Sequence, residues 1–340
     1  MKLIFHIGAG KTGTSSIQAT LKANAPVLQA RGVLYLGLMF EHSPARLFEW
    51  QRFGGQDEFL ALPQAEAEAQ FNRVLQATLR RGREAGVHSM IWSSESFFDR
   101  FDAVLGPLQR ACEQGLDLAV LAYVRAHETW ARSAYIQWGL KHKTYPGRLR
   151  SFGEWVAHRK PLFAPTLARY DDAFPGRLTV RNFDAAGDVV DDFCEFAGLA
   201  DLPLERVHEN HTPDDTELFL RALFNDRQDS DALPMVFDKA VGRLLPQAAS
   251  PTAFLQGLYP HAADIEQVAR HAHADRQAID ALLVQQGQPP LQTGAITPKQ
   301  PRIDDGRLLG ALARLCIANA RRLDALEAED QRLRSGGEPL

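Results

Sequence analysis

Short apolar runs alternate with longer amphipathic stretches over roughly the first 200 residues of the chain. The runs are five to seven residues long, and most of them are apolar without the regular polar alternation of a strand that faces water. Runs of this kind are typical of parallel strands that are covered on both faces. The five predicted strands are KLIFHI (2 to 7), VLYLG (33 to 37), SMIWS (89 to 93), LAVLAYV (118 to 124) and LTVRNF (178 to 183).

The stretches between these runs carry apolar residues at the spacing of an amphipathic helix. The pattern predicts helices over residues 14 to 32, 66 to 86 and 126 to 142. Strands and helices that alternate in this way predict an α/β domain over residues 1 to 200, with a central parallel sheet of about five strands flanked by helices. Ligands of such sheets bind at the carboxyl ends of the strands.

Strand patterns end near residue 200, and the rest of the chain is predicted to be helical. Residues 201 to 287 are expected to form a helical part of the same catalytic domain. A proline-rich stretch over 288 to 302 is expected to be a linker before a C-terminal helix and tail, 303 to 340. The amphipathic pattern of that helix suits a homodimer contact or a partner-binding segment, and the sequence leaves both open.

The charge of the chain is low overall but uneven. The formal net charge is −4, which gives no general attraction to nucleic acid or to an anionic membrane. Between residues 125 and 181, however, eleven Lys and Arg stand against four acidic residues. Within that cluster, LKHKTYPGRLR (140 to 150) suits the binding of an anionic glycan or a lipid-linked sugar, and equally a solvated basic loop.

The three cysteines and the N-terminal segment bear on the compartment. Cys112, Cys194 and Cys316 lie far apart, without the spacing of a metal site or a disulfide framework. The apolar run at the N-terminus is shorter than a signal-peptide core, and no stretch reaches 18 uninterrupted apolar residues. We therefore expect a cytoplasmic protein without a transmembrane segment.

The glycine-rich segment FHIGAGKTGTSSIQ (5 to 18) matches parts of two phosphate-binding loops. A Walker A loop requires glycine where this chain has Phe5, and the acidic partner of such a loop is hard to place, because the fourth strand ends in Arg125. A dinucleotide-binding loop would need an acid at the end of the second strand. The nearest one is Glu41, four residues beyond Gly37, where that strand ends. A turn without a ligand would not explain the hydroxyl and cationic side chains at its helix start.

Those side chains fit a phosphate-binding loop of a third kind. Backbone N–H groups, hydroxyls and one ammonium group would surround a phosphate at the positive end of a helix. Lys11-Thr12-Gly13-Thr14-Ser15 resembles the 5′-phosphosulfate loop of sulfotransferases that use 3′-phosphoadenylyl sulfate (PAPS). Arg125 at a strand end, followed eight residues later by Ser133, resembles the element of that family that binds the 3′-phosphate.

The resemblance covers roughly residues 2 to 285 and implies a P-loop NTPase-like sulfotransferase fold. It implies transfer of the sulfuryl group from PAPS, with 3′-phosphoadenosine 5′-phosphate (PAP) as product and without a metal. Lys11 would neutralise charge on the leaving oxygen. Glu95 in SSESFFD would be the base that deprotonates an acceptor hydroxyl, because carbohydrate-acting members often carry a glutamate there; the acceptor would then be a carbohydrate or glycolipid.

Alternatives remain open at this stage. Glu95 also suits a helix cap or a surface charge. His6, in the first strand, is a rival base, although a histidine there is more often a hydrogen-bonded core residue. A P-loop kinase, or a nucleotide-binding protein without catalytic activity, is the alternative function. Aromatic residues between 38 and 63 suit a loop that selects the acceptor or closes over it.

Overall fold

The computed structural model describes residues 1–143, 145–159, 162–209, 215–226, 251–292 and 301–312, with six further positions between 314 and 326. The chain forms two compact units that are built from interleaved segments. The first unit comprises Met1–Trp130, Pro161–Asn210 and Ala269–Ala295; the second comprises Ala131–Lys160, His211–Val268 and Ile296–Leu340. The sequence predicts a different division, into the consecutive segments 1 to 200, 201 to 287, 288 to 302 and 303 to 340, and that division stays a prediction.

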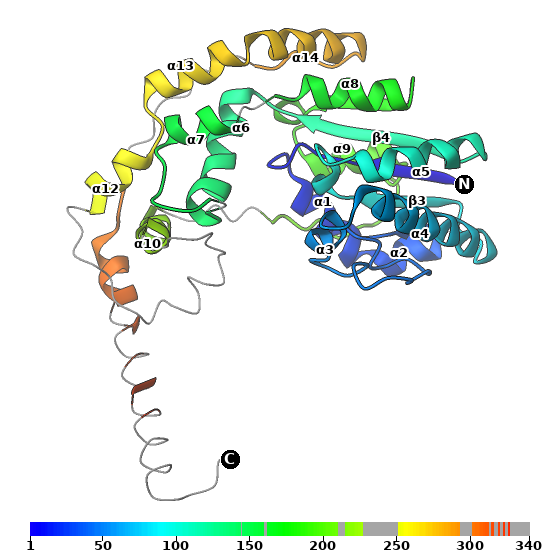
Figure 1. Cartoon of the computed structure of the whole chain (residues 1–340), viewed down its shortest axis with the longest axis horizontal. Helices are drawn as coiled ribbons and strands as arrows, with labels where there is room; N and C mark the ends of the chain where they lie inside the picture. Colours follow the sequence, from blue (N-terminus) through cyan, green and yellow to red (C-terminus); the bar gives the residue numbers. More distant parts are fainter. Residues whose placement is uncertain are drawn as a thin grey trace, which may run out of the picture. The chain divides into compact units, whose positions relative to one another are not determined.

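The first unit is built on a five-stranded, all-parallel sheet in the order β2-β3-β1-β4-β5. The predicted α/β class, with a central parallel sheet flanked by helices, is therefore confirmed (Figure 1). β1 is the central strand. β3 and then β2 lie on one side of it, and β4 and then β5 lie on the other. The strands are β1 (Lys2–His6), β2 (Val33–Tyr35), β3 (Ser89–Ser93), β4 (Asp117–Val124) and β5 (Leu178–Asn182).

One face of the sheet carries a layer of aromatic side chains. Phe5 and Trp92 are register partners on β1 and β3, and their rings stack with centroids 3.9 Å apart. Phe71 and Tyr170, from two of the covering helices, contact this pair. The face is covered by α4 (Gln64–Glu84), α5 (Asp102–Glu113) and α8 (Ala164–Ala173), of which α4 and α5 lie side by side (Figure 1).

The opposite face of the sheet packs against α1 (Thr14–Ala23), α2 (Ala25–Ala30) and α9 (Val189–Ala197). The sequence predicted a single helix over residues 14 to 32, which is wrong, because the helix ends at Asn24 and restarts with Pro26 in the first turn of α2. Proline lacks an N–H and clashes with the preceding turn, so the helix cannot run through it.

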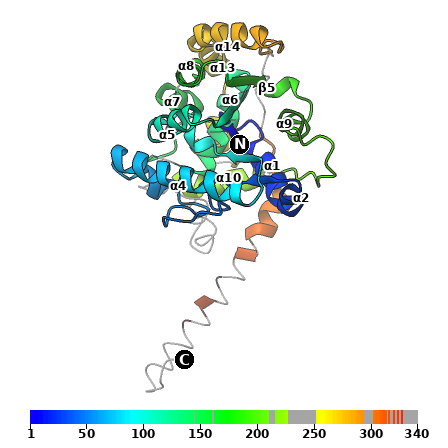
Figure 2. The same cartoon turned by 90° about the vertical axis from the view of Figure 1, so that its right-hand side faces the viewer.

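One further helix and several short elements complete the first unit. The helix α14 (His273–Gln285) packs against α8 and against the edge strand β5 (Figure 2). Buried His127 is joined to Asp275 on α14, with Nε2 and Oδ2 2.7 Å apart. The remaining elements are α3 (Gln56–Leu60), η1 (Glu95–Phe97), η3 (Phe183–Ala185) and the first half of α6 (His127–Ala134).

The elements of the second unit within the described residues are helices. Its elements include the π-helix η2 (Tyr135–Lys141), α7 (Phe152–His158), α10 (Asp215–Asp226), α12 (Pro251–Leu258) and most of α13 (Ala262–His271).

The basic stretch 140 to 150 of this unit is only partly exposed. Lys143 is 1% exposed, and its Nζ donates to the carbonyl of Asn225 at 3.0 Å. Arg150 lies over the Tyr145 ring, 4.4 Å from its centroid. The Lys143 amine is thus buried and not solvated, and the role of the stretch in acceptor binding stays a prediction.

Much of the predicted linker and C-terminal helix falls on residues outside the described part of the chain. Leu309, in the described portion of that helix, is 66% exposed. Across the described residues, every helix is too short or too polar to cross a membrane.

Candidate functional site

The loop between β1 and α1 has an unusual backbone. Gly8, Gly10, Lys11 and Gly13 have φ values of 43°, 62°, 54° and 80°. At Gly13 a Cβ atom would stand 2.5 Å from Cγ1 of Val189, so both conformation and space require glycine there. The glycines of the sequence pattern therefore have a structural reason.

The hydroxyl side chains of the loop divide into two kinds. Thr12 and Thr14 are buried, and their Oγ1 atoms have no hydrogen-bond partner among the described residues. Ser15 is exposed to solvent, whereas Ser16 is buried and accepts a bond from the backbone of Glu209. A buried polar group without a partner costs about 1–3 kcal/mol, so two such groups in one loop call for an explanation.

Lys11 has a backbone conformation that residues other than glycine rarely adopt. Its φ of 54° lies in the left-handed region, where a non-glycine residue costs about 1–3 kcal/mol. The guanidinium of Arg125 holds this turn, because its Nη1 donates to the Lys11 carbonyl at 3.3 Å. The structure thus brings together two predicted site residues that are more than a hundred positions apart in the sequence.

Arg125 follows the last residue of β4 and is paired with a carboxylate, Asp184, that no sequence pattern indicated. Its Nη2 donates to Oδ1 of Asp184 at 3.0 Å, and its side chain is 16% exposed. Burial lowers the pKa of Arg125, and Asp184 partly offsets this shift. Because Val124 and Asn182 are register partners in β4 and β5, residues just beyond each strand must meet; strand order was the missing signal.

A tryptophan anchors the loop from α6. Trp130 is 7% exposed, and its Nε1 donates to the carbonyls of Ala9 at 3.0 Å and Gly10 at 3.2 Å. Ser133 lies one turn further along the same helix and is half-buried, but this part of α6 belongs to the second unit. The predicted role of Ser133 in binding the 3′-phosphate stays a prediction.

Glu95 opens the 3-10 helix η1 two residues after the end of β3, at the carboxyl edge of the sheet. It is half-buried, and its Oε2 accepts a hydrogen bond from Nε2 of Gln18 on α1 at 2.9 Å. Burial raises the pKa of Tyr35 at the end of β2, and the nearby carboxylates of Glu41 and Glu95 raise it further. Glu95 is therefore neither a plain surface charge nor free to rotate.

The expectation that His6 is a hydrogen-bonded core residue is confirmed. It is fully buried, its Nδ1 is 2.8 Å from Oγ of Ser93, and its ring contacts Tyr123 and Phe193. Burial lowers the pKa of His6 to about 3, so the imidazole is neutral at physiological pH.

The loop after β2 uses its acidic and aromatic residues internally. The carboxylate of Glu41, the acid considered for a dinucleotide, accepts bonds from the backbone N–H groups of Leu38 and Met39. Phe40 and Trp50 are buried, whereas Phe53 is 76% exposed. Among these residues, Phe53 is the aromatic side chain that this loop presents to solvent.

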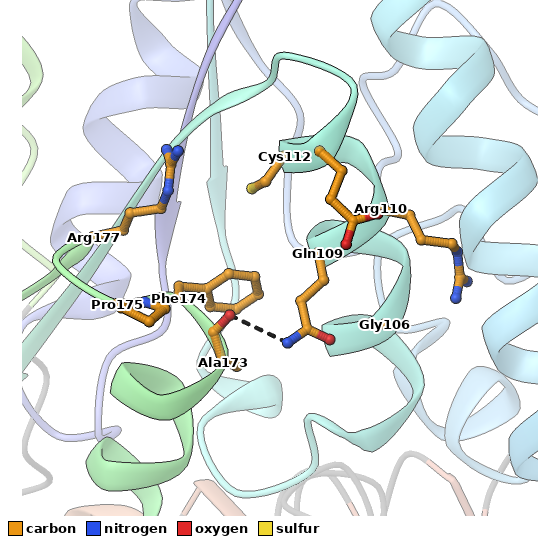
Figure 3. A pocket seen from close by; sticks show the side chains of 9 residues that line it. Gly106, Gln109, Arg110, Cys112, Ala173, Phe174, Pro175 and Arg177 are labelled. Atoms are coloured by element: carbon orange, nitrogen blue, oxygen red, sulfur yellow. Dashed lines mark hydrogen bonds between the residues drawn. The ribbon is translucent and has the colours of Figure 1, made fainter.

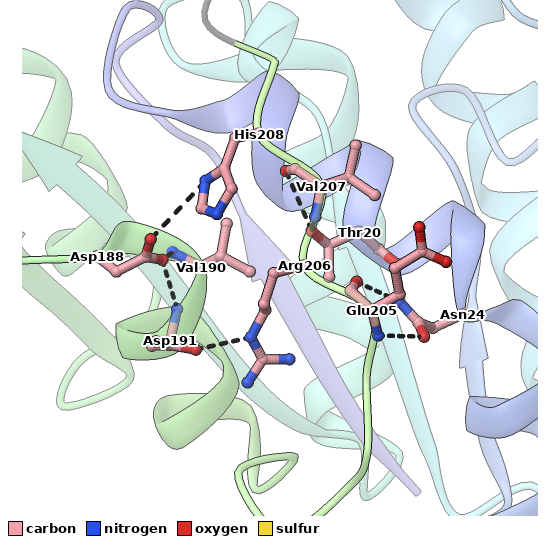
Figure 4. Close-up of polar contacts among 9 residues, drawn as sticks. All are labelled: Thr20, Asn24, Asp188, Val190, Asp191, Glu205, Arg206, Val207 and His208. Carbon is pink, nitrogen blue, oxygen red and sulfur yellow. Dashed lines mark hydrogen bonds and ion pairs between the residues drawn. The ribbon is translucent and has the colours of Figure 1, made fainter.

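Residues 205 to 209 run along one face of α1 (Figure 4). Two polar residues of α1 and the residue that caps its C-terminus, spaced four apart, accept hydrogen bonds from alternate backbone N–H groups of this segment. Four helical residues and two extended residues both span about 6 Å, so the two periods match. The pairs, acceptor first, are Ser16 and Glu209 at 3.0 Å, Thr20 and Val207 at 3.0 Å, and Asn24 and Glu205 at 2.9 Å.

Replacement of Asn24 by alanine should lower the free energy of unfolding by about 2–6 kcal/mol, because two backbone groups of Glu205 would lose their partner and each such group costs about 1–3 kcal/mol. The side chain of Asn24 is 5% exposed, and its Nδ2 also donates to the Glu205 carbonyl at 2.8 Å. Urea denaturation measures the change. Asn72→Ala in α4 is the control, because the Asn72 amide oxygen has no partner among the described residues; equal losses in both variants would refute the role of Asn24.

A hollow of about 410 Å³ lies at the other edge of the sheet, between α5 and the turn that leads into β5 (Figure 3). Gln109, Cys112, Phe174 and Arg177 are among the residues that line it. Because α5 precedes β4 and this turn precedes β5, the hollow lies where strands begin. It is therefore remote from the loop of Lys11.

Fold and site together define an α/β protein whose glycine-rich loop joins the central strand of a parallel sheet to its first helix. No family model matches the chain, and no curated protein matches it. Among solved structures, the chain is similar to the sulfotransferase domain from the curacin biosynthetic pathway, with 11% sequence identity and a TM-score of 0.30. The similarity covers 79% of this chain and 96% of that domain. A similarity at this level leaves the function to the residues of the chain itself.

Proposed function

We propose that the protein is a sulfotransferase that moves the sulfuryl group of PAPS to a hydroxyl of an acceptor, and that this acceptor is a carbohydrate or a glycolipid. The observation that carries the proposal is the pair of buried hydroxyls of Thr12 and Thr14, just before and at the start of α1, which have no partner within the described part of the chain. Glu95 stands at the same edge of the sheet and is joined to α1.

The loop suits an anion with several oxygen atoms. The first turn of α1, all within the described residues, carries no acidic side chain, and its N-terminus has a positive partial charge. The two unpartnered hydroxyls can donate to such an anion, and the left-handed residues of the turn let successive backbone N–H groups face one point. These are the donors that a 5′-phosphosulfate group requires.

The chemistry then falls to two side chains. PAPS supplies a sulfur atom bonded to a phosphate oxygen that can leave. The ammonium of Lys11 neutralises the negative charge that this oxygen gains as its bond to sulfur breaks. The carboxylate of Glu95 accepts the proton of the acceptor hydroxyl as that oxygen bonds to sulfur.

Arg125 and Asp184 should affect PAP binding in opposite directions. Arg125→Ala removes a charged donor, which is worth about 1.5–3 kcal/mol, so PAP affinity should fall by about 10- to 100-fold. Asp184→Asn keeps the shape but removes the carboxylate that pairs with the guanidinium, so PAP affinity should rise. Calorimetric titration measures both. If Asp184→Asn weakens PAP binding as much as Arg125→Ala does, the pair orients the loop and Arg125 does not bind phosphate.

Transfer of labelled sulfate from PAPS to a panel of glycans, glycolipids and phenols tests the proposal. We expect labelled product with at least one carbohydrate acceptor and release of PAP in equal amount. Magnesium-dependent turnover of ATP would instead support the kinase. PAP binding without transfer to any acceptor would support a nucleotide-binding protein without catalytic activity.

A further inference from the structure

A chain of polar contacts connects Glu95 with the interior of the sheet. Gln18 Nε2 donates to Oε2 of Glu95 at 2.9 Å and lies 3.2 Å from the carbonyl of Ser93. The hydroxyl of Ser93 is 2.8 Å from Nδ1 of His6. Because His6 and Ser93 are register partners at the ends of β1 and β3, their side chains project from the same face of the sheet, which is the face that α1 covers.

We propose that Gln18 is a positioning residue that fixes the Glu95 carboxylate for proton transfer. This inference rests on the proposed function of Glu95 as the base. A carboxylate at the end of a flexible side chain has many orientations, and an amide donor at 2.9 Å holds one oxygen and leaves the other to accept a proton. Gln18 itself is held in place by the carbonyl of Ser93.

The position of Gln18 also couples the base to the loop. Gln18 stands four residues after Thr14, so the two side chains lie on the same face of α1, one turn apart. One rigid helix therefore carries both the Thr14 hydroxyl, for which the described residues supply no partner, and the donor that holds Glu95. A shift of α1 that misplaces the loop would misplace the base as well.

His6 extends the network back beneath the loop. Its Nε2 is buried and has no partner among the described residues. A Cβ atom on Gly8 would stand 3.5 Å from this nitrogen and 2.8 Å from Oγ1 of Thr14, so the two unpartnered atoms face the same place. The neutral imidazole, with Nδ1 at Ser93, keeps that serine next to Gln18.

The test is a double-mutant cycle between Gln18 and Glu95. Gln18→Met keeps the length of the side chain and removes its hydrogen bonds. We expect it to lower kcat by about 10- to 100-fold, as small misplacements of catalytic groups do, and to leave PAP affinity within about twofold. In a Glu95→Ala background the same change should have no further effect on kcat, because its target is gone.

Controls separate this inference from the proposed function. Gln70→Met removes an amide on α4 that donates to Glu66 at 3.0 Å and accepts from Nε1 of Trp50 at 2.8 Å, so it loses hydrogen bonds as Gln18→Met does, and it should leave kcat unchanged. Gln18→Glu, which replaces the donor by a second carboxylate, is an independent variant and should lower kcat at least as much as Gln18→Met. Urea midpoints show that each variant folds.

Two results would overturn the inference while leaving the proposed function intact. One is a parental kcat in Gln18→Met or Gln18→Glu. The other is an equal loss of kcat with and without Glu95. If the parent protein itself neither binds PAP nor transfers sulfate, it is the proposed function that fails.

Discussion

Glu95→Gln should lower kcat for sulfuryl transfer by about 10²–10⁴-fold, the range expected for loss of a general base. The substitution keeps the size of the side chain but removes its ability to accept a proton. Glu95 lies at the end of β3 and is bound through one oxygen to Gln18, so it occupies a defined place at the carboxyl edge of the sheet. Steady-state kinetics with PAPS and an accepted acceptor measure the loss.

The matched control for Glu95 is Glu113→Gln. Glu113 is exposed at the end of α5, beside the hollow at the opposite edge of the sheet. This variant should keep the parental kcat, and both variants should keep the parental affinity for PAP. Full turnover by Glu95→Gln would show that another group is the base.

Lys11→Ala should lower kcat by about 10²–10³-fold, which is the usual effect of removing one donor that stabilises charge in the transition state. Lys11→Gly should be as inactive but more stable than the parent, by up to about 1 kcal/mol, because glycine relieves the left-handed backbone at φ 54°. Kinetics and urea denaturation of the two variants measure both effects.

The combination of a lost activity and a gained stability distinguishes a functional lysine from a structural one. Strain at a non-glycine residue persists where the residue serves a function. Lys22→Ala, at the exposed end of the same helix, is the control and should keep the parental kcat. If Lys11→Gly retains turnover, the lysine is not the group that neutralises the leaving oxygen.

The sheet could be predicted from the sequence because each strand is a short apolar run, and all five runs lie within a residue or two of the observed strands. The helix after the loop was predicted too long, since the apolar spacing continues past Asn24 while Pro26 interrupts the backbone. The spacing of apolar residues shows which face of a helix is buried, but it does not show where the helix is interrupted. Here the interruption comes from Pro26, which lacks a backbone N–H.

The site could be predicted only in part. Lys11 and Arg125 were predicted from the resemblance of two short segments to sulfotransferase motifs, and the structure joins them through one hydrogen bond to a backbone carbonyl. Asp184 was missed because its position beside Arg125 depends on β5 lying next to β4, which local pattern does not reveal. Gln18 carried a usable signal, since it stands one turn after Thr14 in the loop helix.

The most direct test of the central claim is calorimetric titration of the protein with PAP and with adenosine 5′-phosphate, in the absence of divalent metal. We expect PAP to bind at least about 10-fold more tightly than adenosine 5′-phosphate, as one charged contact to the 3′-phosphate would give, and we expect Arg125→Ala to remove this difference. Equal binding of the two nucleotides, or no binding of PAP, would contradict the central claim.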